Sequence, residues 1–311
     1  PAFVADDLLY DMTDVYESGE DFNESDFFSA ALETVNMNDR YYGVPLTLGT
    51  TVLLYNEAYI TNPEAIVDWN SWLNIATDEV HSELAAFEGI GVGGYAGWYF
   101  GGFVKSAGGS LVNDALSEVT FHQEPGQEAA AFLRDLYDLS PSSIRNSQSP
   151  FGNGTVLFKL GGGSDIDSLR VNFPTLEFGA MLMPPQVQGD TPYSNIGGDN
   201  IVIFESSQKK ALATELVKFL TSQENALEIA EFTGNFPANE TAIGDAYADD
   251  EHRLVLLEQL EHAAPRPQID GWLRVNDVAI GPALEQILTS DANVVERLDT
   301  AHQEAEAILW D

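Results

Sequence analysis

The residues with the clearest chemical use are three aromatic side chains, Tyr95, Trp98 and Tyr99, in the glycine-rich stretch 89–109. Small neighbouring residues let a ring project from the backbone, so we expect a loop that presents these rings. Flat aromatic surfaces suit the apolar C–H faces of a sugar, while its hydroxyls need fixed polar partners. The stretch therefore predicts a sugar-contacting surface, and the alternative is that Trp98 fills an apolar core.

Two further positions could bind an anion. Gly163-Ser164 precedes a predicted helix, and a helix start suits a phosphate group, although simple capping of the helix explains the same residues. Arg274 could hold a phosphate or carboxylate with two hydrogen bonds. It stands out in a chain with only 13 basic residues, and a surface ion pair is the alternative.

Catalytic, metal and nucleotide motifs are not found in the sequence. It has no cysteine, and its histidines (81, 122, 252, 262, 302) show no metal-ligand spacing. Gly89 to Gly94 matches the dinucleotide fingerprint, but the preceding segment is predicted as a helix rather than the required strand. We predict no metal, no cofactor and no catalytic residue. A glycosidase-like pair of carboxylates remains an alternative, because fifty acidic residues allow many pairs.

The charge balance narrows the class of partner. The sequence has 50 acidic and 13 basic residues, a formal net charge of -37. Nucleic acid is excluded as a partner, since binding it requires many Lys and Arg contacts to phosphates. The acids are spread along the whole chain, which favours adaptation to high salt, where self-repulsion is screened and carboxylates keep the surface hydrated. A 44% hydrophobic content argues against disorder.

Strands and helices alternate in the predicted order of elements, which indicates an α/β architecture. A β-branched and aromatic segment, 50–55, is predicted as a buried strand, and a helix is predicted from Trp69 to about residue 87, with Trp72 in the core. Helices are also predicted over 125–139, 208–221 and twice within 280–310. The inner face predicted for 208–221 comprises Ala211, Leu212, Leu216, Phe219 and Leu220.

Seven short motifs, in order between residues 41 and 238, resemble the family 1 extracellular solute-binding proteins of ABC importers. They are Tyr42-Gly43-Val44-Pro45 with Leu54-Tyr55-Asn56, Trp69-Asn70-Ser71-Trp72, Gly108-Gly109 with Asn113, Phe151-Gly152-Asn153-Gly154, Gly197-Gly198 with Ile203, Ala213 to Glu224, and Thr233-Gly234-Asn235-Phe236-Pro237-Ala238. Pro265-Arg266-Pro267 and Trp272 continue the resemblance more loosely.

The resemblance implies a two-lobed, type II periplasmic-binding-protein-like α/β fold, with crossing hinge strands and ligand held between the lobes. It assigns 1–50 and 199–238 to part of a first lobe, and 51–198 and 239–311 to the second. Because about forty residues precede the first motif, we expect the first lobe to be incomplete and an export signal or lipid anchor to lie upstream. Crossings are expected near Thr50-Thr51 and Ile196–Gly198.

The same resemblance implies the site and the partners. Beside Trp98, Tyr99 and Tyr95, it favours ligand contacts from the following residues: Thr50, Gly163, Ser164, Gly197, Gly198, Asn200, Asn235, Trp272 and Arg274. The expected protein is an extracellular monomer that captures a sugar or sugar phosphate and delivers it to a membrane permease. The alternatives are a glycoside-acting enzyme and a surface interaction protein without a small ligand.

Overall fold

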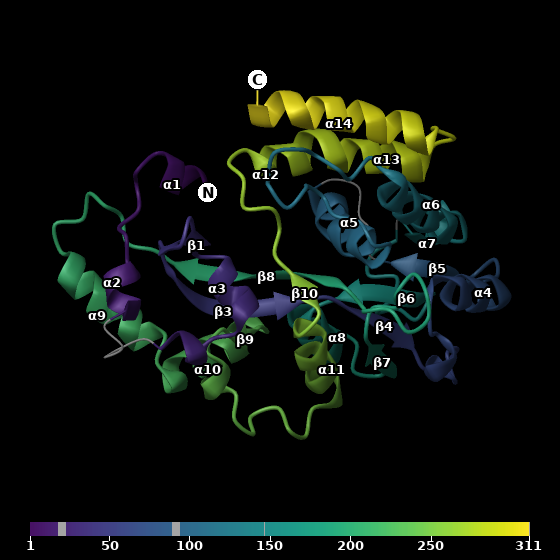
Figure 1. Ribbon diagram of the computed structural model, residues 1–311. Helices are drawn as coiled ribbons and strands as arrows, with labels where there is room; N and C mark the ends of the chain where they lie inside the picture. The colour runs from purple at the N-terminus through teal and green to yellow at the C-terminus, as the bar shows by residue number, and fades with distance from the viewer. Residues whose placement is uncertain (18–22, 89–93, 146, 311) are drawn as a thin grey trace.

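The computed structural model describes residues 1–17, 23–88, 94–145 and 147–310. Its strands are β1 (Asn36–Met37), β2 (Arg40–Tyr41), β3 (Val44–Thr50), β4 (Val52–Asn56), β5 (Ala85–Glu88), β6 (Val156–Gly161), β7 (Phe178–Met181), β8 (Ser194–Ile201), β9 (Phe236–Pro237) and β10 (Ala263–Ala264). A first sheet has the order β10-β8-β3-β9 and a second the order β5-β6-β4-β7, and β1 and β2 form a hairpin. Two lobes, each built around one of the four-stranded sheets, lie side by side (Figure 1).

Helices surround both sheets. They are α1 (Ala2–Ala5), α2 (Thr13–Glu17), α3 (Ser29–Glu33), α4 (Trp69–Glu79), α5 (Gly94–Ser106), α6 (Glu124–Asp138), α7 (Ser142–Arg145), α8 (Gly163–Asn172), α9 (Lys210–Leu220), α10 (Gln223–Thr233), α11 (Glu251–Leu260), α12 (Trp272–Val275), α13 (Gly281–Thr289) and α14 (Val294–Trp310). Short 3-10 turns are η1 (Glu24–Asp26), η2 (Pro63–Ala65) and η3 (Glu240–Ala242), and η4 (Asn276–Ile280) is π-helical. This mixture confirms the predicted α/β class. None of the helices in the described ranges is long and apolar enough to cross a bilayer.

One nearly continuous strand joins the two sheets. β3 ends at Thr50 in the first sheet, and β4 begins at Val52 in the second, so the chain crosses between lobes at Thr51. β8 runs antiparallel to β3, with Thr50 opposite Ile196, and its first residues pair with β10. β8 therefore lies in the first sheet from Ser194 onwards, and this crossing falls ahead of the expected Ile196–Gly198.

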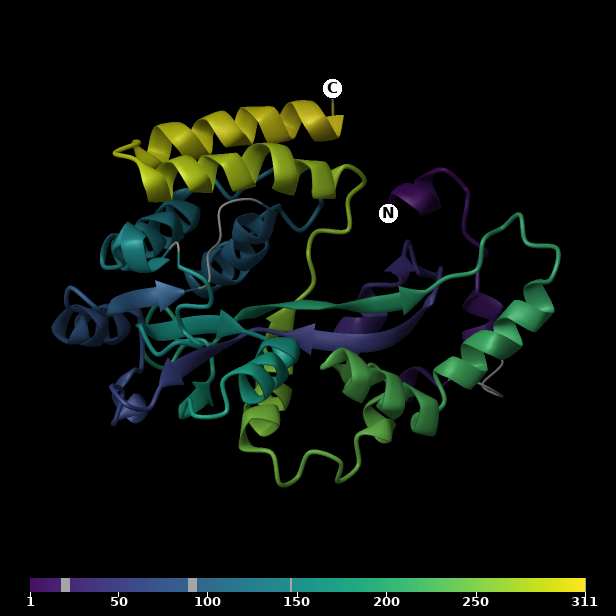
Figure 2. The same cartoon turned by 180° about the vertical axis from the view of Figure 1, so that it is seen from behind.

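The second sheet is covered on both faces. Helices α4, α5 and α6 lie on one face, with α13 and α14 packed as an outer layer on α5 and α6, and α8 and α11 lie on the opposite side (Figures 1 and 2). Trp72 is fully buried in the apolar core between the second sheet and the helices α4 and α6, and the rings of Phe87, Phe132 and Phe158 lie edge-on to it. The prediction that Trp72 is a core residue is confirmed.

The other face of the second sheet shares its core with the first lobe. Buried side chains continue from Leu54 and Phe178 in the second sheet to Leu48 and Phe236 in the first. Helix α11 contributes Leu256 and Leu260 to this shared core. The two lobes are thus joined by a continuous apolar interior as well as by the crossing strand.

The expected loop around Trp98 is wrong, because residues 94–106 form helix α5. Its glycines serve close packing rather than chain flexibility. A Cβ at Gly97 would stand 2.2 Å from Asn276 Oδ1, one at Gly101 would stand 3.1 Å from Asn195 Oδ1, and one at Gly102 would stand 3.2 Å from Ser194 Cα. The missing side chains therefore let α5 approach β8 and η4, and tertiary packing outweighs the low helix propensity of glycine.

Two other elements in the structure differ from those predicted from the sequence. Helix α4, which begins with a capping box between Asp68 and Ser71, ends at Glu79. Residues 85–88, expected to continue this helix, instead form β5, whose apolar side chains fit either pattern. In α9 the predicted inner residues Leu212, Leu216 and Phe219 are exposed, because Val217 is the buried residue and the helix turns a different stripe inward.

Candidate binding cleft

Three hollows meet around the connecting segment Pro265–Gln268, which leads from β10 to α12. We call the first the tryptophan hollow. It has a volume of about 420 Å³ and lies between α5, β8 and α12, lined among others by Trp98, Lys105, Asn195, Trp272 and Asn276. Arg266 and Gln268 close it on the side of the connecting segment.

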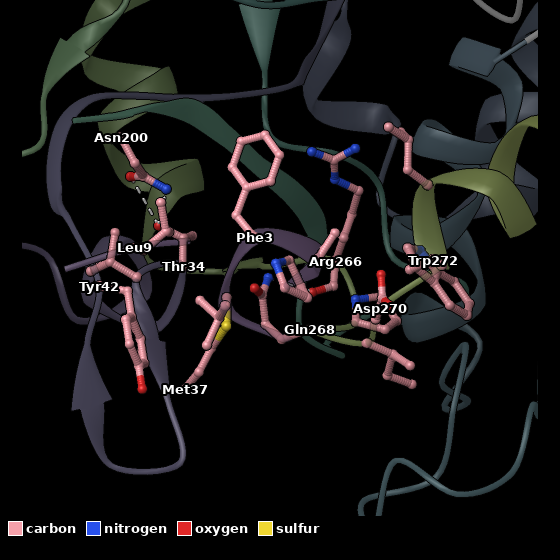
Figure 3. Close-up of a pocket in the computed structure, with 18 of the residues that line it drawn as sticks. Phe3, Leu9, Thr34, Met37, Tyr42, Asn200, Arg266, Gln268, Asp270 and Trp272 are labelled. Atoms are coloured by element: carbon pink, nitrogen blue, oxygen red, sulfur yellow. Dashed lines mark hydrogen bonds between the residues drawn. The ribbon is translucent and has the colours of Figure 1, made fainter. Parts of the chain in front are cut away.

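The second, which we call the apolar hollow, also has a volume of about 420 Å³. Figure 3 shows Thr34, Met37, Tyr42 and Asn200 on one side of it, Arg266, Gln268, Asp270 and Trp272 on the other, and Phe3 between them. The first group belongs to the first lobe and the second to the segment that enters the second lobe. This hollow therefore lies between the lobes.

The third, the glycine hollow, has a volume of about 220 Å³ and a floor formed by Gly197 and Gly198 on β8 and Thr47 on β3. Arg266 and Gln268 line this hollow as well as the other two. The three hollows thus adjoin one another, and we describe them together as the cleft, defined by Trp98, Trp272, Arg266, Gln268 and the Gly197-Gly198 floor.

Helix α5 and strand β8 fix the ring of Trp98. Trp98 is half-buried, and Tyr99 meets it edge-on with ring centroids 5.0 Å apart. A Cβ built at Gly197 would stand 3.6 Å from Trp98 Cζ2, so the two residues adjoin and the ring lies in van der Waals reach of the glycine floor. An aromatic face beside exposed backbone is the combination that a polyhydroxylated ring requires.

Polar groups around the cleft are held by hydrogen bonds between the strands. Thr50 Oγ1 lies 2.6 Å from Ser194 Oγ and donates to the carbonyl of Asn195 at 2.9 Å, which fixes β3 against β8. The side chain of Asn195, itself buried, borders the tryptophan hollow. On the first lobe, the amide of Asn200 donates to Thr34 Oγ1 at 3.1 Å.

A separate polar cluster joins α8 to the end of α10. The Arg253 side chain is almost fully buried and donates from Nη1 to the carbonyl of Gly234 and from Nη2 to Asp167, both at 2.6 Å. A Cβ at Gly163 would stand 2.0 Å from the same carbonyl oxygen. The start of α8 is therefore packed against the protein, and it lines none of the three hollows.

No group of three or more His, Cys, Asp or Glu side chains that could hold a metal ion occurs within the described ranges. The cleft combines aromatic surface, amide side chains and exposed backbone, which are groups suited to non-covalent binding of a polar solute.

Comparison with known proteins identifies the family. Residues 1–254 match the sequence profile of the bacterial extracellular solute-binding proteins. The chain belongs to this family. As a member of the bacterial extracellular solute-binding proteins, it comes from a group that binds solutes rather than transforming them, which favours the binding-protein interpretation over the glycosidase one.

Relatives of this solute-binding protein agree in fold. It is 25% identical over 300 residues to the galactooligosaccharide-binding protein of Bacillus subtilis, an alignment that covers 91% of this chain and 69% of the relative. The structure of the sugar-binding protein MalE from Xanthomonas citri superimposes with a TM-score of 0.87 at 19% identity, covering 99% of this chain and 81% of that one. A Thermotoga lettingae ABC transporter solute-binding protein bound to α-D-tagatose gives a TM-score of 0.83 at 22% identity, covering 99% and 82%. The type II two-lobed fold is confirmed.

Five of the residues predicted from the sequence of this solute-binding protein line the cleft: Trp98, Gly197, Gly198, Asn200 and Trp272. Trp272, only 4% exposed, belongs to the core of the second lobe and also borders two hollows. Trp272 is thus both a core residue and a cleft residue.

The other predicted residues lie elsewhere. Thr50 has its hydroxyl engaged by β8, and Tyr99 packs beside Trp98 on the core side of α5. Asn235 lies against Gly49, Ser164 is exposed at the start of α8, and Arg274 is exposed on α12. Tyr95 belongs to α5, but its side chain falls outside the described part of the solute-binding protein, as do residues 89–93 of the glycine fingerprint.

Among the cleft residues of the solute-binding protein that sequence reasoning missed are Lys105, Asn195, Arg266 and Gln268. A signal existed for two of them. Lys105 follows Trp98 by seven residues and so shares its face once the segment is helical. Arg266 stands between two prolines, which hold a connecting segment extended.

Proposed function

We propose that this solute-binding protein captures a sugar or sugar phosphate in the cleft between its lobes and delivers it to the permease of an ABC importer. The observation that carries the proposal is the pairing of the Trp98 ring with the side-chain-free floor at Gly197 inside a cleft between lobes. Support comes from the relatives whose names specify galactooligosaccharide and maltodextrin binding.

The proposed contacts divide by chemistry. Trp98 and Trp272 supply apolar surface for the C–H faces of a sugar ring. The amides of Asn195, Asn200 and Gln268 supply donors and acceptors for hydroxyl groups, and Gly197-Gly198 lets the ligand approach backbone. Ligand held by both lobes would favour the closed arrangement, since it gains contacts that the open one lacks.

Titration of intrinsic tryptophan fluorescence with monosaccharides, maltooligosaccharides and sugar phosphates tests this proposal, with calorimetry to give affinities. We expect saturable binding that falls about tenfold or more in Trp98→Ala, because stacking surface is lost. A matched control is Trp310→Ala, which removes an exposed tryptophan from the end of α14. Absence of binding throughout the panel, or hydrolysis of chromogenic glycosides, would contradict the proposal.

The proposal extends to the setting in which the protein acts. We propose that it works outside the cell as a monomer, close to the permease and attached to the membrane by an anchor outside residues 1–311. Size-exclusion chromatography with light scattering in molar salt tests the monomer, and fractionation of cells tests the attachment. A dimer, or a fully released protein, would contradict the corresponding part.

A further inference from the structure

Positive charge is scarce in this protein, and nearly half of it is paired with carboxylates. The sequence has 13 basic against 50 acidic residues. Within the described ranges, ion pairs to carboxylates engage Arg40, Lys159, Arg170, Lys210, Lys218 and Arg253. A basic side chain that lacks such a pair and also lines a cleft is informative, because its charge is available to a solute.

Two such side chains line the tryptophan hollow. Neither Arg266 nor Lys105 has a carboxylate within 4.0 Å among the described residues. Arg266 also lines the other two hollows, and among the described residues it is the single charged side chain that lines the glycine hollow. The cleft thus places its most widely shared cation beside the exposed backbone of Gly197 and Gly198.

Lys105 is aligned with the aromatic platform. It follows Trp98 by seven residues on α5, which places the two side chains on one face of the helix, and both line the tryptophan hollow. Its Nζ lies 4.9 Å from the centroid of the Tyr193 ring, a contact that orients the ammonium without neutralising it.

The carboxylates near this hollow do not neutralise the two cations. Glu33 and Asp114 line it, and Asp270 lines the apolar hollow together with Arg266. These carboxylates are exposed, as is Arg266, and none of them forms an ion pair with Lys105 or Arg266. Withdrawing an unpaired cation from water as a cleft closes is costly, unless a counter-charge enters with the solute. A neutral sugar would leave that cost in place, whereas an anionic one would remove it.

From these observations we infer that the solute carries an anionic group, a carboxylate or a phosphate, received by Arg266 and Lys105 while its sugar ring lies on Trp98. The inference rests on the proposed function and narrows it to an acidic sugar. Arg266 has the planar fork that binds either group through two parallel hydrogen bonds, and Lys105 adds a point charge.

Calorimetric titration of the full chain tests the inference with matched sets of three ligands: a neutral sugar, its uronic acid and its 6-phosphate, built on glucose and on galactose. We expect the acidic member of at least one set to bind about tenfold or more tightly than its neutral counterpart. Affinity for the acidic member should also fall as salt is raised. Whether the uronic acid or the phosphate binds better identifies the source of the charge.

Variants connect the preference to the two side chains. Arg266→Gln and Lys105→Gln should each lower affinity for the acidic sugar about tenfold or more and change that for the neutral sugar less than about twofold. Arg274→Gln and Lys209→Gln, which alter exposed cations outside the three hollows, should leave both affinities unchanged. Equal or tighter binding of neutral sugars overturns the inference and leaves the proposed function intact, whereas no binding by any member of the panel counts against both.

Discussion

Gly197 lies beside the ring of Trp98, and the Cβ it lacks would stand 3.6 Å from Trp98 Cζ2. That distance is an ordinary van der Waals contact, so the position has room for a methyl group. The pair thus brings the Trp98 ring into contact distance of the glycine floor.

Substitutions at Gly197 should therefore separate binding from folding. Gly197→Ala should fold normally and keep most of its affinity, because its Cβ meets only ordinary contacts. Gly197→Leu should lose binding about a hundredfold or more, since its side chain enters the glycine hollow and displaces the Trp98 ring. Calorimetric titration and thermal unfolding measure the two effects, and equal affinity in both variants would contradict the arrangement.

Arg253 should be essential for stability because it is 5% exposed and satisfies the carbonyl of Gly234 and the carboxylate of Asp167 at once. Arg253→Met should lower the free energy of unfolding by about 2–4 kcal/mol, since it leaves that carbonyl and that carboxylate without their donor. Arg253→Lys should be little more stable than Arg253→Met, because an ammonium group lacks the planar fork with which the guanidinium reaches both acceptors. Denaturant unfolding measures both, with Arg274→Met as an exposed control.

The acid side of the stability curve should depend on Asp250. The hydrogen bonds that Arg170 donates lower the pKa of Asp250 to about 2. Burial acts against this shift, and the backbone amide of Arg253 adds to it. A carboxyl whose pKa is lowered by folding stabilises the protein above its unfolded pKa and loses that contribution as pH falls through the folded one. Asp250→Asn, which still caps α11, should lower the free energy of unfolding by about 1 kcal/mol at pH 7, because solvent screens this partly exposed ion pair. The difference from the parent should vanish near pH 2, and a constant difference between pH 7 and pH 2 would refute this origin.

The stacked pair His122 and His302 should cause a second loss of stability, at a pH closer to neutrality. Their rings stack with centroids 3.8 Å apart, and neither Nδ1 has a hydrogen-bond partner among the described residues. Burial, and then the charge of His302, lower the pKa of His122, although Asp299, Glu118 and Glu306 act in the opposite sense. The unfolded chain thus binds the proton more readily, so stability should fall as pH drops below the ordinary histidine pKa of about 6.5.

His122→Phe keeps the stacked ring and removes the proton site. We expect it to flatten the decline in melting temperature between pH 7 and pH 5. His81→Phe, at an exposed position, serves as the control and should keep the decline. A decline of the same size in His122→Phe and the parent would count against the stacked pair.

Salt should stabilise the whole chain. With a net charge of -37, repulsion between carboxylates acts over about 10 Å at 0.1 M salt and about 3 Å at 1 M. Dilution from molar to low salt should therefore lower the melting temperature markedly, as scanning calorimetry can measure. An unchanged melting temperature would exclude salt adaptation as the reason for the acidic composition.

The sequence predicted elements well where one local pattern was sufficient. The apolar spacing over 125–139 predicted helix α6, found at Glu124–Asp138, and the α/β class followed from the alternation of elements. Helix α5 was taken for a loop because glycine has a low helix propensity, and only contacts with Asn195 and Asn276, far away in sequence, favour the helix. Arg266 was missed for the same reason: the hollows it borders arise from α5, β8 and the first lobe together.

The positions of the paired strands along the chain affect how the protein can fold during synthesis. β4 is paired by β6 and β7, all complete by Met181, whereas β3 waits for β8 and β9, which begin at Ser194 and Phe236. During synthesis from the N-terminus, the second sheet can therefore assemble while β3, with Val44 and Leu48, is still without a neighbour. The nascent chain carries this unpaired apolar strand for some 150 residues of translation, the interval in which a chaperone would be needed most.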